Sequence, residues 1–484
     1  MDDLQTAAPA QPRLKGVIGP WGLTALVIGV TSPAIGLFAT WGPIEAAAGP
    51  VAPLVFLAAL LIILPTVLSY ASLNRHAPSA GAAVTWLWTS VSPTVAMTAG
   101  LVMASYLLSA AITVPLLFGL FLRDLLEWLG VAAPGMAVVA AGVLLQSALV
   151  AWICLRGAQA SIRTTIALML LETCVVLALS ATILWVKASQ PGGINLGPFA
   201  PSHATQGLGG LWAAVILGML AFSGFDVIAA SAEEAEAPRT HVPRVLVLGV
   251  IGIGVFWALN SWVLTLSAAP AQVLAYNAQG LTAITPIARI YWGSGAIFVI
   301  VTAFTGLTAV YIATVQGASR ILFAMARQDL LPAVLARVSA ERCVPRAAVW
   351  FSVLTCVAVD LVSLLLLAGG LDAFVWWSGA LVFFAAITFT GVNVANLCYF
   401  RRVLPGRFHL LHNLIVPVLG VGLSLYLLYA AFFQALWSQP FRTGRSVVIV
   451  CMALLGFQIA GVLWIRLSRP AALTGPAPMQ AAEG

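Results

Sequence analysis

Residues 221–234 read AFSGFDVIAASAEE, and they place a serine, a glycine and an aspartate inside an apolar run. In a water-soluble protein this stretch would be an ordinary loop. The composition excludes that class, because 61% of the 484 residues are hydrophobic and only 8% are charged, whereas soluble domains carry about 25% charged residues. Too little polar surface is available to cover a globule in water, so the sequence predicts a protein embedded in lipid.

Apolar runs long enough for a membrane helix, about 20 residues, recur along the whole chain. Clusters of proline and glycine separate them. We predict twelve spans, near residues 17–47, 51–72, 94–120, 136–155, 164–187, 207–232, 245–268, 290–318, 347–368, 372–400, 414–437 and 446–467. The predicted fold class is therefore an all-α polytopic membrane protein.

The basic residues predict the orientation of these spans. With the N-terminus inside, the inner segments hold 17 of the 22 Lys and Arg residues and the outer segments hold the other 5. This bias predicts that both termini are cytoplasmic, in a multi-pass protein of the plasma or bacterial inner membrane. The net charge of +7 then reflects topology and does not indicate a nucleic-acid partner. The polar, acidic start of the chain predicts no cleavable signal peptide.

Two of the predicted spans contain helix-breaking residues at corresponding places. The first span is interrupted by TSPAIG (31–36), where Pro33 lacks a backbone N–H and Gly36 disfavours helix. The sixth span is interrupted by SGFD (223–226). These spans are the first helices of two successive sets of five, which predicts a pair of unwound helices related by an inverted repeat.

Main chain that is freed at such breaks cannot face lipid and must line a cavity. The N–H groups of the first break suit a carboxylate, and the carbonyls at 221–223 suit an ammonium group. We therefore predict a site for an amino acid or a related small amine, formed by Thr31, Ser32, Pro33, Ala34, Ile35, Gly36, Ala221, Phe222, Ser223, Gly224, Phe225 and Asp226. The alternative is a proline kink in one helix and a packing patch of small residues in the other.

Two acids at membrane depth are candidates for coupling transport to protons. An aspartate in mid-membrane costs about 2.5–3.5 kcal/mol to insert, so Asp226 is expected to face a cavity or a partner. It either contacts the ligand or a proton, or it caps the second half of the sixth helix. Glu172, on the fifth span, either carries a proton or makes a structural hydrogen bond, since desolvation penalises its charged form.

Other polar residues have more modest predicted roles. Glu233, Glu234, Arg239 and Arg244 form either a cytoplasmic latch or a solvated loop. Asp360, Asp372 and Glu45 are interpreted as helix-end charges. The apolar and basic pattern of residues 316–346 predicts an amphipathic helix on the inner face. Further candidates to face the cavity are Ser105, Tyr106, Ser109, Trp376 and Trp377.

Three stretches resemble the amino acid–polyamine–organocation (APC) permeases. GFDVIAASAEEAEAPRTHVPR (224–244) is similar to the sixth-helix signature of that family. YASLNRHAPSAGAAVTWLW (70–88) resembles its loop after the second helix, and SRILFAMARQDLLP (319–332) the inner end of its eighth helix. The first break departs from the family, since TSPAIG replaces the common Gly-x-Gly turn. In some proton-coupled members a lysine occupies the region of Glu172.

The resemblance covers about residues 17–467 and implies a leucine-transporter-type fold, with a five-plus-five inverted repeat and two extra C-terminal helices. It also implies uptake or exchange of amino acids or related amines. The segments are a cytoplasmic tail (1–16), a first repeat (17–187), a second repeat (207–400), two final helices (414–467) and a cytoplasmic C-terminal tail (468–484).

The predicted function is a secondary active transporter that works by alternating access, coupled to protons or exchange, with no cofactor, metal or catalytic residue. A non-transporting amino-acid sensor would use the same site and stays an alternative. A membrane-embedded enzyme is disfavoured, because all five histidines lie in predicted loops. No phosphate-binding Gly-x-x-x-x-Gly-Lys motif is present, which disfavours ATP-driven pumping.

Overall fold

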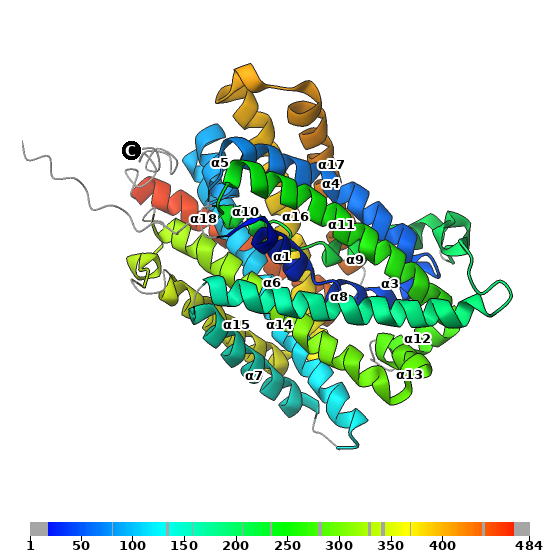
Figure 1. Cartoon of the computed structure of the whole chain (residues 1–484). Coiled ribbons are helices and arrows are strands. Elements are labelled where there is room, and N and C mark those ends of the chain that lie inside the picture. The colour runs from blue at the N-terminus through cyan, green and yellow to red at the C-terminus, as the bar shows by residue number, and fades with distance from the viewer. Residues whose placement is uncertain are drawn as a thin grey trace, which may run out of the picture.

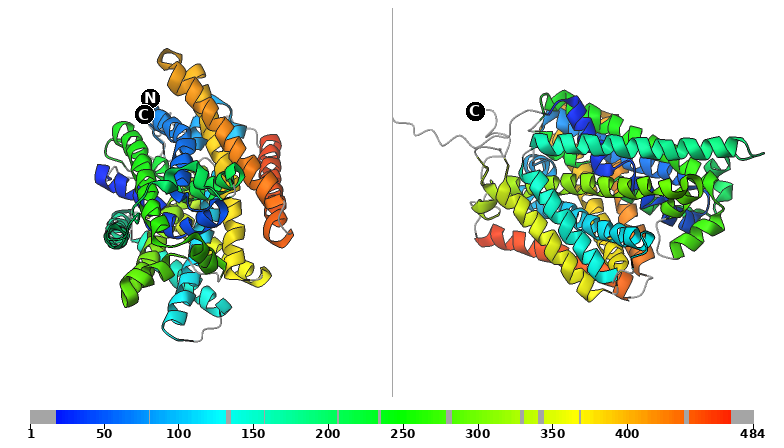
Figure 2. Two further views of the ribbon diagram at one scale, coloured as in Figure 1. Left: turned by 90° about the vertical axis from the view of Figure 1, so that its right-hand side faces the viewer. Right: turned by 60° about the horizontal axis from the view of Figure 1, so that its bottom comes forward.

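The fold is known from a computed structural model. The structure describes residues 18–79, 81–131, 135–156, 158–205, 207–232, 235–278, 283–327, 331–339, 344–367, 369–437 and 441–468. Within these residues the secondary structure is helical, apart from an isolated bridge between Ile18 and Ala235. The long helices pack together into a single bundle, at varied inclinations to one another (Figures 1 and 2).

Ten helical segments in the described part of the chain are long and apolar enough to cross a membrane. They are α4 (Ala52–His76), α6 (Pro93–Trp128), α7 (Gly135–Leu155), α8 (Ala158–Ala188), α11 (Pro238–Ser267), α13 (Ile284–Trp292) continued by η4 (Gly293–Ala296) and α14 (Ile297–Ala326), α15 (Arg346–Leu366), α16 (Gly370–Arg402), η7 (Leu411–Ile415) continued by α17 (Val416–Leu428) and η8 (Tyr429–Leu436), and α18 (Ser446–Ser468). Each of them overlaps one of the predicted spans.

Shorter helical elements connect these segments. They are α5 (Ala83–Ser90), η1 (Gly197–Phe199), η2 (Pro201–His203), α12 (Pro270–Ala278), η5 (Ala333–Ala336), η6 (Pro405–Arg407) and η9 (Phe441–Arg445).

The first and sixth predicted spans are broken where the sequence predicts. α1 (Pro20–Thr31) ends before Pro33, and the helix resumes as α2 (Ile35–Phe38) and α3 (Trp41–Ala48). α9 (Gly207–Ala221) ends before a run of turns, and the chain resumes as α10 (Val227–Ala230). One residue at each break has a positive φ, +47° at Ser32 and +104° at Gly224. Glycine adopts such a φ without steric cost.

The two broken helices lie side by side in the bundle. The C-terminal part of the first, α3, packs against α9, while its N-terminal part, α1, packs against α10. α1 also contacts α8, α11 and α14, so the breaks are enclosed by continuous helices (Figure 1).

The prediction of an amphipathic surface helix at 316–346 is wrong. Residues 316–326 form the buried C-terminal end of α14, and η5 is a single turn. Residues 328–330 and 340–343 lie outside the described residues. The basic pattern is misleading because Arg320, only 5% exposed, lies inside the bundle and donates to the Gln316 side-chain amide oxygen at 3.4 Å.

Candidate functional site

The freed main chain of the first break binds an acid from another helix. The Ser32 hydroxyl donates a hydrogen bond to Oε2 of Glu172, which lies on α8. The Ala34 amide donates to the same oxygen at 3.3 Å, and the Ile35 amide donates to Oγ of Ser32 at 3.0 Å. The other Glu172 oxygen, Oε1, has no hydrogen-bond partner among the described residues. A fully buried carboxyl group therefore occupies the donors that the sequence assigns to an anionic ligand.

Close packing against α11 and α14 holds this break in place. The indole N–H of Trp257, on α11, donates to the Pro33 carbonyl at 3.1 Å. A Cβ atom on Gly36 would lie 2.1 Å from the Trp257 ring, so only glycine fits there. Gly306 of α14 similarly faces Ser32 and Glu172, with 2.8 Å between an added Cβ and the serine hydroxyl.

The second break is organised by two tyrosines. The Gly224 amide donates to the Tyr106 hydroxyl at 2.6 Å, and that hydroxyl donates to Oδ1 of Asp226 at 3.0 Å. The Tyr70 hydroxyl donates to Oδ2 of Asp226 at 3.3 Å. Asp226 is fully buried. Its carboxyl group thus links α4 and α6 to the break, and Tyr106 connects it to the freed amide of Gly224.

The predicted capping role of Asp226 is wrong. Asp226 stands directly before α10, but its side chain makes no cap hydrogen bond to that helix. Both carboxylate oxygens are directed to the tyrosine hydroxyls instead, which lie on neighbouring helices. Whether the Asp226 side chain caps α10 or contacts other helices depends on Tyr70 and Tyr106, which are distant in the sequence.

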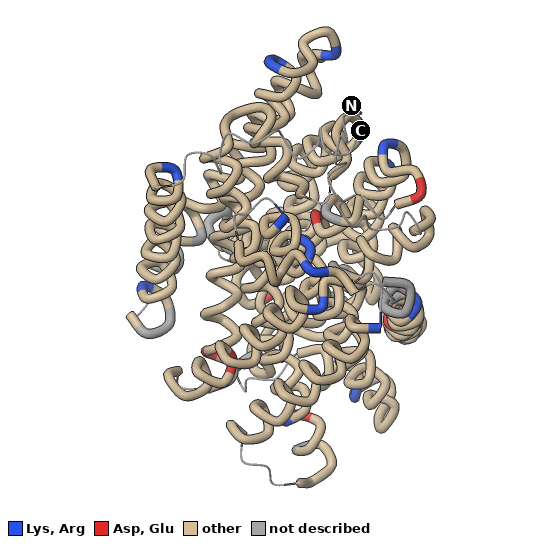
Figure 3. Tube along the Cα trace, turned by 90° about the vertical axis from the view of Figure 1, so that its left-hand side faces the viewer, with Lys and Arg blue, Asp and Glu red and all other residues tan. Residues whose placement is uncertain are grey.

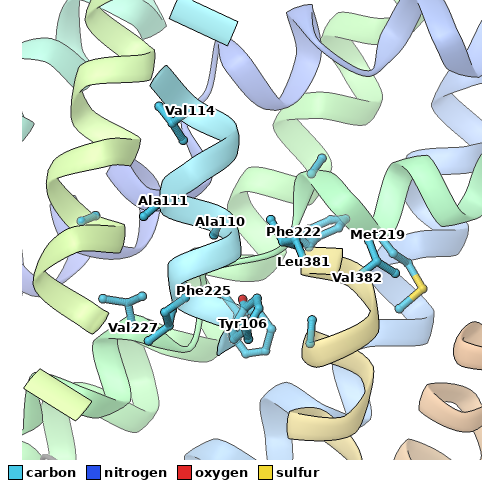
Figure 4. Packing of buried hydrophobic residues seen from close by; sticks show 14 of the residues in the cluster. Tyr106, Ala110, Ala111, Val114, Met219, Phe222, Phe225, Val227, Leu381 and Val382 are labelled. Atoms are coloured by element: carbon cyan, nitrogen blue, oxygen red, sulfur yellow. The ribbon is translucent and has the colours of Figure 1, made fainter. Parts of the chain in front are cut away.

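The rest of the predicted site is apolar and enclosed. Among the twelve predicted break residues, all are buried except Ile35 and Ser223, which are partly exposed. Phe222 packs edge-on against Trp257, with ring centroids 5.0 Å apart, and Phe225 packs against Tyr70 at 5.6 Å. Around them, Figure 4 shows the buried side chains of Ala110, Ala111, Met219, Leu381 and Val382.

Several secondary candidates lie away from the breaks. Ser105 accepts a hydrogen bond from Gln458 on α18 at 2.7 Å, so it faces that helix. Trp376 and Trp377 donate to Ser446 and Ser363 and line a separate cavity of about 660 Å³ between α15, α16 and α18. The expectation that these three residues face the predicted site is therefore wrong, whereas Tyr106 faces the second break.

The remaining acids have varied environments. Asp372 lies in the first turn of α16, as expected of a helix-end charge. Asp360 does not fit that expectation, because it lies inside α15, fully buried beside Tyr311 and Cys356. Glu45, in the last turn of α3, is buried and accepts from the Thr265 hydroxyl at 2.5 Å.

The predicted latch falls partly outside the described residues, since Glu233 and Glu234 do. Its basic members, Arg239 and Arg244, lie in the first two turns of α11. The latch stays a prediction. Within the described residues, no group of three His, Cys, Asp or Glu side chains is arranged to hold a metal ion.

Sequence reasoning missed three residues of the site: Tyr70, Trp257 and Gly306. Tyr70 begins the motif at 70–88, but nothing local connects it to Asp226, 156 residues away. A tryptophan and a glycine within long apolar helices give no local signal of their partners.

Tyr106→Phe is expected to destabilise the protein more than Tyr70→Phe. The first substitution leaves the Gly224 amide and one Asp226 oxygen unpaired, and each buried unpaired polar group costs about 1–3 kcal/mol. The second removes only the longer bond to Oδ2. Thermal unfolding of the two purified variants in detergent measures the difference. Equal losses of stability would show that Tyr106 does not connect Asp226 to the break.

Comparison with known proteins agrees with these features. The sequence profile of the amino acid permease family matches residues 18–457. The chain is 26% identical over 403 residues to the branched-chain amino acid permease of Bacillus subtilis, covering 79% of this chain and 83% of that protein. It is 29% identical over 324 residues to the branched-chain amino acid permease of Lactococcus lactis, covering 63% and 66%.

A human protein is also similar. The large neutral amino acids transporter small subunit 2 is 26% identical over 254 residues, which is 52% of this chain and 44% of that protein. These relatives are transporters by name, and the family profile spans nearly all of the membrane helices. The chain belongs to the amino acid permease family of the APC superfamily.

Proposed function

We propose that the protein is a secondary active transporter that moves a large neutral amino acid across the membrane by alternating access. The observation that carries this proposal is the pair of helix breaks lying side by side, each supported by a buried acid. Unwound main chain near the midplane recognises charged substrate groups with few charged side chains.

The two ends of an amino acid match the two breaks. Its carboxylate would bind the amides of Ala34 and Ile35, where the half-helix α2 begins. Its ammonium group would bind the carbonyls of Phe222 and Ser223, which accept no turn hydrogen bond from the described backbone. Every break residue except Asp226 is uncharged, which favours a zwitterionic ligand over a cationic amine.

The apolar lining suggests the substrate class. Phe222, Phe225, Ala110, Ala111 and Val382 offer apolar surface for a side chain, and burying a leucine or isoleucine side chain contributes about 1.5–3 kcal/mol. Relatives named for branched-chain and large neutral amino acids point the same way. We infer that leucine, isoleucine and valine are the preferred substrates.

Glu172 supplies the coupling to protons in this proposal. Its Oε2 accepts hydrogen bonds from the Ser32 hydroxyl and the Ala34 amide. A charged Glu172 would therefore repel the substrate carboxylate and compete with it for these two donors. Protonation of Glu172 removes that repulsion. Substrate binding and proton binding then favour each other, as linkage requires, and the two move together as symport.

The membrane arrangement in the proposal follows the predicted topology. In this proposal the ten long helical segments and the two broken helices are twelve spans, arranged as two repeats of five and a final pair. The distribution of Lys and Arg supports a cytoplasmic location for both termini.

Counterflow in proteoliposomes tests the function. Liposomes that contain the purified protein and are loaded with unlabelled leucine are expected to take up labelled leucine transiently. Isoleucine and valine should compete, and arginine and putrescine should not. Leucine binding without counterflow would indicate a sensor, and exchange of putrescine in place of leucine would indicate an amine carrier.

A further inference from the structure

A basic cavity lies at the end of the molecule where α4 finishes. Its volume is about 480 Å³, within the ~300–1,000 Å³ range typical of small-molecule sites. The last turns of α4 form its floor, and the start of α11 and the η6–η7 region form its walls. None of the residues that line it belongs to the two helix breaks.

Six basic side chains are among those that line this cavity. These are Arg75, His76, Arg244, Arg407, His409 and His412. An adjoining cavity of about 330 Å³ shares three of them and adds Arg239. No Asp or Glu is among the described residues lining either cavity, and within the described chain these arginines form no ion pair. Lys and Arg clearly outnumber Asp and Glu in the view of Figure 3.

Apolar side chains also line this cavity. Leu68, Val247 and Leu248 line it, and Leu248 is 62% exposed. From Leu248, the exposed side chains of Ile251, Val255 and Leu259 continue along α11. Residues spaced three or four apart share one helix face, so an apolar stripe leads from the basic cavity toward the centre of the membrane.

We propose that this cavity binds the headgroup of an anionic phospholipid, whose acyl chains lie along the α11 stripe. Basic pockets between membrane helices on the cytoplasmic side attract anionic headgroups, and the predicted orientation places this end in the cytoplasm. Guanidinium groups form paired hydrogen bonds with phosphate oxygens. The combination of arginines without an ion-pair partner among the described residues and an adjoining exposed apolar stripe favours a lipid over a free anion.

Native mass spectrometry of the purified protein in neutral detergent tests this site. Phosphatidylglycerol is expected to bind at least tenfold more tightly than phosphatidylcholine with the same acyl chains, and less tightly as salt concentration rises. The triple variant Arg75→Gln, Arg244→Gln, Arg407→Gln should weaken phosphatidylglycerol binding at least tenfold and leave phosphatidylcholine binding unchanged.

The matched control carries two neutralised cations at the other end of the bundle, Lys187→Gln and Arg289→Gln. It should bind phosphatidylglycerol like the wild type. If the triple variant does not fold, each single arginine variant should still weaken binding roughly fivefold. Undiminished phosphatidylglycerol binding by the arginine variants overturns the proposal. So does glycerol phosphate that binds as tightly as the lipid, since it would indicate a site for free anions.

Discussion

Substituting Gly36 by alanine is expected to abolish leucine transport and to lower the melting temperature of the purified protein markedly. The added Cβ would lie 2.1 Å from the Trp257 ring. This ring is fully buried, and its N–H donates a hydrogen bond to the Pro33 carbonyl. Overpacking a tight core costs about 1–3 kcal/mol, and this contact belongs at the upper end. Thermal unfolding in detergent and leucine counterflow measure the two effects.

Gly252→Ala is the matched control for this substitution. Gly252 lies on the same helix as Trp257, but nothing stands within 4 Å of the Cβ it would gain, so stability and transport should be unchanged. The double variant Gly36→Ala, Trp257→Leu should be more stable than Gly36→Ala alone, because the smaller side chain relieves the clash. If Gly36→Ala behaves like Gly252→Ala, the first break does not have this packing.

Glu172→Gln is expected to uncouple transport from the proton gradient while leaving exchange intact. Glutamine keeps the shape of the side chain and an oxygen that accepts from Ser32 and Ala34, but it cannot take up and release a proton. Proteoliposomes with the variant should show leucine counterflow at a rate near that of the wild type. Their accumulation of leucine, driven by an inwardly directed proton gradient, should fall to the level of equilibration.

Asp226→Asn tests whether the coupling role belongs to Glu172 and not to Asp226, the buried acid at the second break. It weakens the bonds from Tyr70 and Tyr106 without touching Glu172, so any remaining transport should keep its response to the gradient. Full gradient-driven accumulation by Glu172→Gln would contradict the coupling role, because no titratable group would then remain at the first break.

The overall architecture could be predicted from the sequence because it depends on local properties. Span positions follow from hydrophobic length, and the breaks follow from the backbone chemistry of Pro33 and Gly224. The site contacts could not be predicted. The bond between Ser32 and Glu172 joins residues 140 apart, and the bond between Tyr106 and Asp226 joins residues 120 apart. Such pairs depend on helix packing, which no single segment encodes.

The same limit explains the wrong predictions. Asp360 lies near the end of an apolar run, but its helix continues to Leu366, and the Asp360 side chain is buried inside the bundle. Trp376 and Trp377 lie on a helix that borders the breaks at Val382, yet their register directs them toward α15 and α18. Helix position alone does not fix which face of a buried helix meets the substrate.

A structure of the protein with leucine bound tests the central claim most directly. Leucine is expected between the two breaks, its carboxylate about 3 Å from the Ala34 or Ile35 amide and its ammonium group beside the Phe222 and Ser223 carbonyls. Glu172 should then have released the Ala34 amide. Leucine bound at another place, or helices that continue unbroken through Pro33 and Gly224 around it, would contradict the account.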